Sequence, residues 1–268
     1  MTLNIRKNIT QFLKNRPVIF RAISKVYFAL QPVHLMELLI GTKAREREWA
    51  RRHLYKSSDW RNNQHVGRDD EWVRGYWESQ NHSHRKILLD KISKYLPKSI
   101  LEIGCNCGPN LHLLAKKFPD IEMKGIDINP CAVEKGNELF ALECISNITL
   151  SVGKADELEQ IGDKSFDIVF TDAVLIYIGR DKIQKVIQEM LRIAQKAVIL
   201  VEWHSFIPQN KKDPLGLGFY HHGCWERDYS TLLRQFIPEK QVSISKITKD
   251  VWADEIWSTA GAIIEVIM

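Results

Sequence analysis

Residues 101–110, which read Leu-Glu-Ile-Gly-Cys-Asn-Cys-Gly-Pro-Asn, decide the fold of this chain. An apolar run ends at Gly104, and Gly104 and Gly108 allow the backbone to turn tightly and to approach a ligand closely. Asn106 is among the few non-glycine residues that tolerate a positive φ, and Pro109 suits the first turn of a helix. The stretch therefore predicts a strand, a tight loop and a helix, the unit that binds ligands in open α/β sheets.

Apolar strands and amphipathic helices alternate on either side of this loop. The strands predicted in this region are 99–103, 123–127, 148–152, 166–171 and 197–202, and the helices are 109–118, 131–142 and 182–194. Strands of continuous apolar character that alternate with helices indicate a parallel sheet covered on both faces. We therefore predict an α/β fold with a doubly wound, mostly parallel sheet.

The C-terminal part of the chain continues the same domain. A helix at 228–236 and strands at 242–247 and 262–267 are predicted. Residues 203–225 lack periodicity and contain several prolines and glycines, which predicts a long loop of the kind that is often functional. Because no linker interrupts residues 83–268, they form one predicted domain.

The N-terminal part differs in composition. Residues 1–45 predict one or two amphipathic helices, and the charge-rich residues 44–62 predict a solvated helix. Residues 63–82 hold Trp72, Tyr76 and Trp77, and they predict a cap that leads into a helix beginning near residue 83. Residues 1–82 are therefore interpreted as an α-helical N-terminal extension and cap.

Composition narrows the class of protein. The chain has 268 residues, of which 44% are hydrophobic and 26% charged, and it has no run of eighteen apolar residues that would predict a membrane span. Five cysteines, an odd number without a disulfide pattern, favour a reducing cytoplasm. Cys105 and Cys107 form a lone C-x-C, so no metal site is predicted.

The net charge of +5 is concentrated at the N-terminus. Residues 1–60 contain 12 Lys and Arg against 4 Asp and Glu, so the remainder of the chain is mildly acidic. This disfavours a nucleic-acid footprint over the whole domain. The alternatives for the basic segment are a helical extension packed on the core, peripheral contact with a membrane, and contact with a partner or substrate.

Two cofactor classes compete for the loop at Gly104. A dinucleotide requires G-x-G-x-x-G, and here the second and third glycine positions hold Asn106 and Pro109. Glu102 would repel a pyrophosphate, whereas it would attract the sulfonium and ammonium groups of S-adenosylmethionine. The loop therefore favours S-adenosylmethionine over NAD.

Acidic residues follow the second and third predicted strands. Asp127 stands 23 residues after Gly104, at the position of an acid that binds ribose hydroxyls, a requirement that NAD and S-adenosylmethionine share. Asp156 follows the third strand, where it can accept a hydrogen bond from an adenine amino group. The alternatives are a turn or cap for Asp127 and a helix N-cap for Asp156.

The ordered motifs Glu102-x-Gly104-x-Asn106-x-Gly108, Asp127, Ala155-Asp156 and 166–169 resemble those of class I S-adenosylmethionine-dependent methyltransferases, of the type 11/12 kind, over roughly residues 80–268. The resemblance implies a Rossmann-like, seven-stranded sheet of order 3-2-1-4-5-7-6 with the last strand antiparallel. It implies that Gly104 and its neighbours shape the methionine pocket, that Glu102 faces the ammonium group, and that Asp127 and Asp156 hold ribose and adenine. The cofactor-binding residues expected from it are Glu102, Gly104, Cys105, Asn106, Gly108, Asp127, Ile128, Ala155, Asp156 and Thr171.

In this family the segment after the fourth strand, residues 171–178, lies beside the transferred methyl group. Positioning matters most for such a displacement, and a base is useful when the acceptor is a hydroxyl. The candidate catalytic residues are Asp172, Tyr177 and His204, with His221 and His222 as further candidates; the alternative for each histidine is a solvated loop residue.

The segment from Trp72 to His84 often covers the cofactor in this family. Arg85 or Tyr76 is then expected to meet the methionine carboxylate, and the alternative is that Tyr76 and Trp77 are packing anchors.

The resemblance implies an enzyme of class EC 2.1.1 that methylates an oxygen or nitrogen atom of a small molecule. A sugar or surface-glycan precursor is the acceptor suggested by the similarity of 72–85 and 170–178 to glycan-pathway enzymes. The alternatives are a methyltransferase for RNA or protein, which only the basic N-terminus supports, a non-catalytic S-adenosylmethionine-binding module, and an NAD(P) oxidoreductase.

Overall fold

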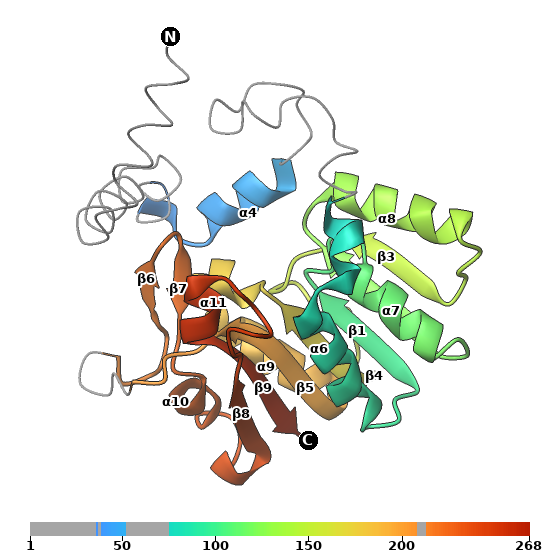
Figure 1. Ribbon diagram of the computed structural model, residues 1–268. Helices are drawn as coiled ribbons and strands as arrows, with labels where there is room; N and C mark the ends of the chain where they lie inside the picture. Colours follow the sequence, from blue (N-terminus) through green and yellow to red (C-terminus); the bar gives the residue numbers. More distant parts are fainter. Residues whose placement is uncertain (1–35, 37–38, 52–74, 208–212) are drawn as a thin grey trace.

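A computed structural model describes residues 36, 39–51, 75–207 and 213–268. Its centre is a twisted seven-stranded sheet in the order β3-β2-β1-β4-β5-β9-β8 (Figure 1). Strands β1 to β5 run parallel, and β9 runs antiparallel to both of its neighbours. The strands are β1 Ser99–Ile103, β2 Glu122–Asp127, β3 Ile148–Val152, β4 Phe166–Asp172, β5 Ala194–Trp203, β8 Val242–Lys246 and β9 Gly261–Ile267. The predicted doubly wound sheet and its strand order are confirmed.

Helices cover both faces of this sheet (Figure 1). Those outside the N-terminal region are α6 Ser83–Ser93, α7 Pro109–Lys117, α8 Pro130–Leu142, α9 Ile183–Ile193, α10 Tyr229–Leu233 and α11 Glu255–Ala260. Alternate residues of β5 belong to two separate buried clusters, with Ile199 in the cluster of α6, α7 and α8 and Val198 in the cluster of α9 and α10. Because successive side chains of a strand point to opposite faces, the two clusters are the two covered faces of the sheet.

One predicted loop contains regular structure. Within 203–225, the structure forms a hairpin of β6, Phe219–His221, and β7, Cys224–Glu226, so the interpretation as a loop throughout was wrong. His222 and Gly223 at its turn have φ of 49° and 83°. Two successive positive φ values are those of a type I′ hairpin turn, whose twist matches that of the strands. Helix α11 and the 3-10 turn Leu175–Tyr177 were also not predicted.

The described part of the N-terminal region is mainly helix α4, Lys43–Arg51, which agrees with the start of the helix predicted at 44–62. Most of the amphipathic segment predicted at 1–45, together with residues 52–62 and Trp72, lies outside the described residues. The start of α4 is joined to the core by Thr42, whose hydroxyl donates to Asp181 at 2.6 Å and accepts from the Gly179 amide at 2.6 Å. Helix α4 therefore lies over the carboxyl ends of the parallel strands (Figure 1).

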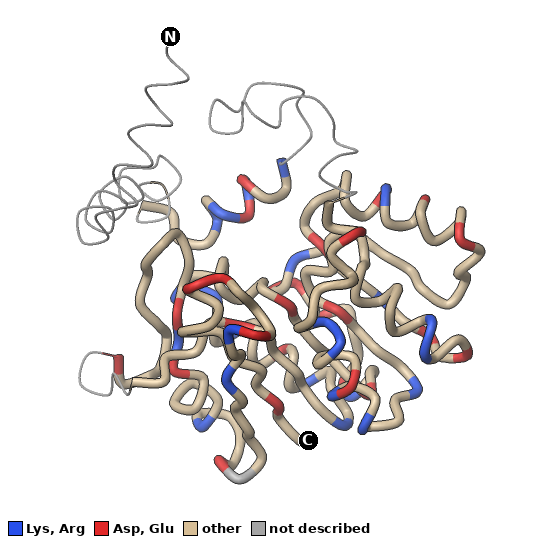
Figure 2. Tube along the Cα trace, viewed as in Figure 1, with Lys and Arg blue, Asp and Glu red and all other residues tan. Residues whose placement is uncertain are grey.

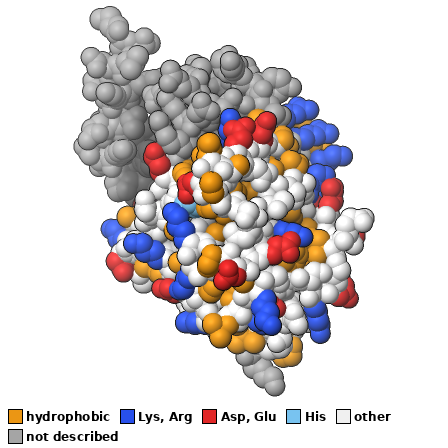
Figure 3. Space-filling view, turned by 90° about the vertical axis from the view of Figure 1, so that its right-hand side faces the viewer, with side chains coloured by type: hydrophobic (Ala, Val, Ile, Leu, Met, Phe, Trp, Pro, Cys, Tyr) orange, Lys and Arg blue, Asp and Glu red, His pale blue; other side chains and the backbone are white. Residues whose placement is uncertain are grey.

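Basic and acidic side chains are intermixed over the described part of the surface. Figure 2 shows Lys and Arg interspersed with Asp and Glu along the chain, α4 included, and Figure 3 shows apolar, basic and acidic side chains side by side on one face. Within the described ranges, no helix is both long and apolar enough to cross a membrane, and no group of three or more His, Cys, Asp and Glu side chains is arranged to hold a metal ion.

Candidate functional site

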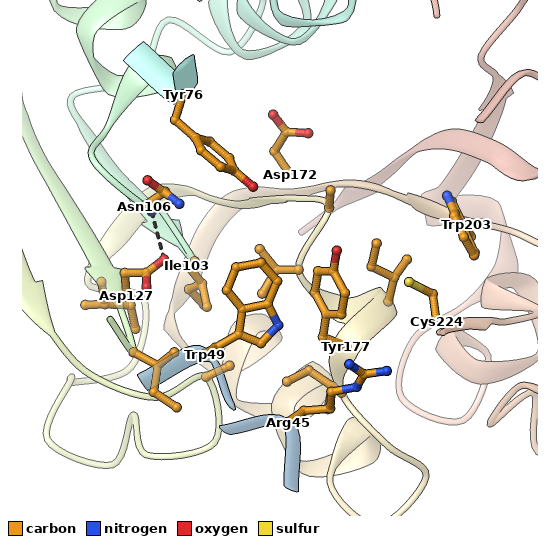
Figure 4. Close-up of a pocket in the computed structure, with 18 of the residues that line it drawn as sticks. Arg45, Trp49, Tyr76, Ile103, Asn106, Asp127, Asp172, Tyr177, Trp203 and Cys224 are labelled. Carbon is orange, nitrogen blue, oxygen red and sulfur yellow. Dashed lines mark hydrogen bonds between the residues drawn. The ribbon is translucent and has the colours of Figure 1, made fainter. Parts of the chain in front are cut away.

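A cavity of about 820 Å³ lies at the carboxyl ends of the parallel strands, beneath α4. Ligands of doubly wound sheets bind at this edge, where the strand order reverses between β1 and β4. Figure 4 shows its two ends: Asp127 and Asn106 lie at one end, and Trp203 and Cys224 lie at the other. Cofactor-sized and acceptor-sized molecules therefore have separate ends of one cavity available to them.

The turn after β1 has the conformation predicted from its glycines. Gly104 and Cys105 both donate their backbone N–H to the Ile126 carbonyl, at 2.7 and 3.0 Å, and φ of Gly104 is 75°. A Cβ at position 104 would lie 2.2 Å from the Val174 side chain. Asn106 has φ of 52°, which confirms its interpretation as a residue that tolerates this region. The turn leaves its backbone exposed to the cavity because no side chain stands at Gly104.

Asp127 at the end of β2 is held in one orientation. One carboxylate oxygen accepts the backbone N–H of Asn106 at 2.8 Å, and the other accepts that of Asn129 at 2.8 Å (Figure 4 shows the first of these bonds). Burial raises the pKa of Asp127, and the backbone donors oppose that rise. Each carboxylate oxygen has two lone pairs, so this side chain can still accept hydrogen bonds from a bound diol.

Glu102 on β1 and Asp172 on β4 both accept hydrogen bonds from the Asn110 side chain. Glu102 is only 1% exposed and is not part of the cavity wall; one oxygen accepts from the Asn110 side chain at 2.7 Å, and the other has no hydrogen-bond partner among the described residues. Burial raises the pKa of Glu102 well above its ordinary value. Asp172 lines the cavity instead.

The Asp172 carboxylate is fixed by three side chains. Its Oδ2 accepts from Arg85 at 2.9 Å and from Asn110 at 3.1 Å, and it lies 2.9 Å from Nε2 of His84. Its Oδ1 is buried and has no hydrogen-bond partner among the described residues. Although burial raises the pKa of Asp172, His84 and Arg85 more than offset it and hold the pKa below its ordinary value. The cavity wall thus contains an ionised carboxylate whose orientation is fixed by its neighbours and whose Oδ1 is enclosed by protein.

Aromatic rings line the other end of the cavity. Trp252 and Trp257 stack at 3.9 Å between ring centroids, with an angle of 2° between their planes, and His84 stacks on Trp252 at 4.2 Å. Between the two ends, Trp49 of α4 contacts Tyr177 at 5.0 Å between ring centroids (Figure 4). This part of the cavity can take a molecule with a flat or apolar face.

The structure brings together most of the predicted site residues. Those that line the cavity are Tyr76, Arg85, Gly104, Asn106, Asp127, Ile128, Ala155, Asp156, Asp172 and Tyr177. Trp77 packs against His112 at 4.5 Å and Phe140 at 5.5 Å, as expected of a packing anchor. Asp156 also forms an ion pair with Lys182 at 2.7 Å.

Other predicted residues lie away from the cavity wall: Glu102, Cys105, Gly108, Thr171, His204, His221 and His222. Thr171 donates to Glu202 at 2.8 Å, and His221 lies 3.0 Å from the Glu226 carboxylate. His204 lines a second, smaller cavity with Phe206 and Arg234, and its Nδ1 accepts the Tyr229 amide at 3.3 Å.

Glu202 and Arg227 form hydrogen bonds with the backbone of residues 174–178, the segment that carries Tyr177. Glu202 accepts the backbone N–H groups of Val174, Leu175 and Ile176 at 3.0 to 3.1 Å. Arg227, which is fully buried, donates to the carbonyls of Leu175 and Ile178. These two buried side chains fix a segment of backbone that forms one wall of the cavity.

Protonation of Glu202 is expected to make the stability of the protein depend on pH. Burial raises the pKa of Glu202 to about 7 from 4.5, with its hydrogen bonds opposing the rise, so the folded protein keeps a proton that the unfolded chain releases. Stability therefore falls as pH rises from about 4.5 to about 7. A Glu202→Gln variant lacks this titration. The unfolding free energies of the unsubstituted protein and of the variant are both measured with urea. Their difference should change by up to about 3 kcal/mol over this pH range, to the disadvantage of the unsubstituted protein as pH rises. A difference that stays constant with pH would contradict the shifted pKa.

Parts of this chain are similar to known methyltransferases. A family model described as a methyltransferase domain matches residues 100–197. A human tRNA N(3)-cytidine methyltransferase, METTL6, is 26% identical over 177 residues, which are 63% of this chain and 60% of that protein. A probable tocopherol O-methyltransferase of Oryza sativa subsp. japonica is 33% identical over 111 residues, which are 40% of this chain and 29% of that protein.

The matched part of this chain thus spans less than two thirds of the length of each of these relatives. Among solved structures, a geranyl diphosphate methyltransferase in complex with GPP and sinefungin superposes with a TM-score of 0.52 at 13% identity, over 69% of this chain and 76% of the other. At this identity the likeness concerns the fold.

Proposed function

Because this chain belongs to the class I S-adenosylmethionine-dependent methyltransferases, we propose that it transfers a methyl group to an oxygen or nitrogen atom of a small molecule bound in the 820 Å³ cavity. The observation that carries the proposal is the division of that cavity into a polar end at Asp127 and an aromatic end at Trp252 and Trp257. A sugar or a surface-glycan precursor is the acceptor that we favour.

The polar end fits S-adenosylmethionine. Asp127 is oriented to accept hydrogen bonds from the ribose hydroxyls, and the bare backbone at Gly104 leaves room for the methionine portion. The negative charge of Asp172 suits the ammonium group better than that of Glu102 does, since Asp172 lines the cavity and Glu102 lies behind it. A pyrophosphate would meet the same carboxylates with repulsion. Bound S-adenosylmethionine supplies a methyl group on a positively charged sulfur.

The remaining cofactor contacts follow from the order of the strands. Ala155 and Asp156, after β3, are proposed to border the adenine, and Ile128 is proposed to pack beside the nucleoside. Asp156 also pairs with Lys182, which pairs with Glu46 of α4. Cofactor binding is therefore proposed to be linked to the position of α4 over the cavity.

The aromatic end supports a small acceptor. Trp49 and Tyr177 stand between the two ends in Figure 4, and Trp203 and Cys224 close the far end. Stacked indole rings offer flat apolar surface of the kind against which a ring or chain packs. Holding the acceptor in line with the methyl group is the main contribution of these residues, because proximity and orientation dominate such a displacement.

A second candidate acceptor is tRNA, which is the substrate named for the human relative. The net charge of +8 over residues 1–60 supports it, because Lys and Arg neutralise backbone phosphates. The same segment supports peripheral contact with an acidic membrane surface. The odd number of cysteines, without a disulfide pattern in the sequence, supports a reducing compartment such as the cytoplasm.

Transfer of a labelled methyl group tests the proposal. The full chain is incubated with methyl-labelled S-adenosylmethionine and separately with small-molecule, RNA and protein fractions of a cell extract. We expect label in the small-molecule fraction. Label in the RNA fraction alone, weakening steeply with added salt, would favour tRNA instead. Binding of S-adenosylmethionine without transfer to any fraction would indicate a non-catalytic module.

A further inference from the structure

Three side chains form a continuous line of contacts from the sheet to the cavity. Oδ2 of Asp172 lies 2.9 Å from Nε2 of His84, and Nδ1 of His84 lies 2.6 Å from Nδ1 of His82. His82 and His84 both line the cavity, His84 buried and His82 half-buried. Both rings pack against Trp252, at 4.8 and 4.2 Å between centroids. An acid and two imidazoles in series are the components of a proton relay.

The protons of this line can be assigned from its charges. Nε2 of His84 faces a carboxylate oxygen, so it carries a hydrogen and donates. Arg85 already balances the charge of Asp172 at 2.9 Å, and a second buried cation on His84 would be uncompensated. His84 is therefore neutral, and its Nδ1 is an acceptor.

It follows that Nδ1 of His82 donates to His84 and that Nε2 of His82 carries a lone pair. A competing arrangement exists, because the backbone N–H of His84 lies 3.4 Å from the same Nδ1 of His82. One nitrogen cannot donate to the ring and accept from the amide together. The ring contact is 0.8 Å shorter, so we assign it as the bond that is made.

We propose that His82 is the general base of this site and that His84 and Asp172 are the residues that position it, which makes the acceptor a hydroxyl compound. This rests on the proposed function. The acceptor O–H bond breaks and its proton passes to Nε2 of His82. The electron pair left on oxygen forms the new O–CH₃ bond, the C–S bond breaks with its electrons remaining on sulfur, and His82 later releases the proton to water.

The surroundings of His82 suit this task. Burial lowers the pKa of His82, the positive charge of Arg85 lowers it further, and Asp172 opposes them. Among the described residues, the titratable and charged groups that act on His82 are His84 and Arg85 of α6 and Asp172 of β4. The ring is therefore neutral at pH 7 and able to accept a proton. Uptake of that proton gives a cation that the Asp172 carboxylate stabilises through His84.

Nuclear magnetic resonance of the full chain, labelled with ¹⁵N in its histidine rings, tests the assignment without any acceptor. The His82 signals are identified from their loss in a His82→Gln variant, and His221→Gln on the β6–β7 hairpin is the matched control. At pH 8 we expect Nδ1 of His82 to be protonated and Nε2 to be unprotonated, with titration below pH 6.5.

A second variant makes the test sharper. His84→Phe keeps a ring to stack on Trp252 and removes both nitrogen contacts, so Nδ1 of His82 is left with the amide of residue 84. We expect the His82 tautomer to switch, with the proton moving to Nε2. A His82 that is already protonated at Nε2 in the unsubstituted protein, or one whose tautomer does not respond, would overturn the proposal.

Calorimetry with S-adenosylmethionine separates this outcome from failure of the proposed function. Intact binding together with the wrong tautomer rejects the relay and leaves the methyltransferase function standing. Once a labelled product is found, His82→Gln should lower kcat at least 100-fold and leave cofactor affinity within about twofold, in line with the usual contribution of a general base.

Discussion

Replacing Asp127 with alanine is expected to lower the affinity for S-adenosylmethionine about 100-fold. The carboxylate is proposed to accept two hydrogen bonds from the ribose, and hydrogen bonds to a charged group contribute about 1.5 kcal/mol or more each. A loss of about 3 kcal/mol corresponds to about 100-fold in the dissociation constant. The variant also frees the amides of Asn106 and Asn129, which relaxes the turn over which the cofactor lies. Isothermal titration calorimetry measures the effect.

Asp120→Ala is the matched control for this prediction. Asp120 is an exposed aspartate in the turn before β2, outside the cavity wall. The Asp120→Ala variant should bind S-adenosylmethionine with the same affinity as the unsubstituted protein does. Equal affinities in Asp127→Ala and Asp120→Ala would show that the cofactor site has been assigned to the wrong residues.

Replacing Arg227 with alanine is expected to destabilise the protein by about 3–5 kcal/mol, the usual cost of breaking a buried charged network. Arg227 is 0% exposed and donates to two backbone carbonyls of the 175–178 segment. Its loss leaves these carbonyls and the neighbouring Glu202 without a cation and opens a cavity beneath Tyr177. The free energy of unfolding in urea measures the effect.

Arg234→Ala provides the comparison. The Arg234 side chain is 50% exposed and pairs with the exposed Glu239 at 3.0 Å, and exposed ion pairs contribute about 0–1 kcal/mol. The unfolding free energy of the Arg234→Ala variant should therefore lie within about 1 kcal/mol of that of the unsubstituted protein. Similar losses in the two arginine variants would mean that the buried contacts of Arg227 are not what holds the 175–178 segment.

The fold was predictable because its signals are local. Each parallel strand is a short apolar run, each covering helix has its own periodicity, and the loop at Gly104 has glycines where the backbone needs positive φ. The β6–β7 hairpin was missed because its strands have three residues each, too few for an alternation pattern. Its signal was His222-Gly223, a turn that accommodates two positive φ values.

The cofactor end of the site was predictable for a related reason. Asp127 is the last residue of β2 and Asp156 lies in the loop after β3, so the topology of the sheet carries both to one edge. Glu102 was expected to face the ligand, yet the structure places its side chain behind the cavity wall, with Asn110. The pattern predicted which strand end mattered but not which of two neighbouring carboxylates reaches the cavity.

The acceptor end was not predictable, because it is assembled from distant segments. His84 meets Asp172 across 88 positions of sequence, and Trp252 and Trp257 come from the region between β8 and β9. Nothing in the local pattern around Trp252 distinguishes a cavity wall from ordinary packing. His204 was a candidate base for a hydroxyl acceptor, but the structure places it in a different cavity, with Phe206 and Arg234.

The central claim is that the edge of this sheet binds a cationic nucleoside without phosphate, and calorimetry with two ligands tests it most directly. S-adenosylmethionine and NADH are each titrated into the unsubstituted full chain under the same buffer and salt. We predict saturable binding of S-adenosylmethionine with a dissociation constant between about 1 μM and 1 mM, the range usual for enzyme substrates, and no heat of binding from NADH. Saturable binding of NADH with none of S-adenosylmethionine would contradict the account.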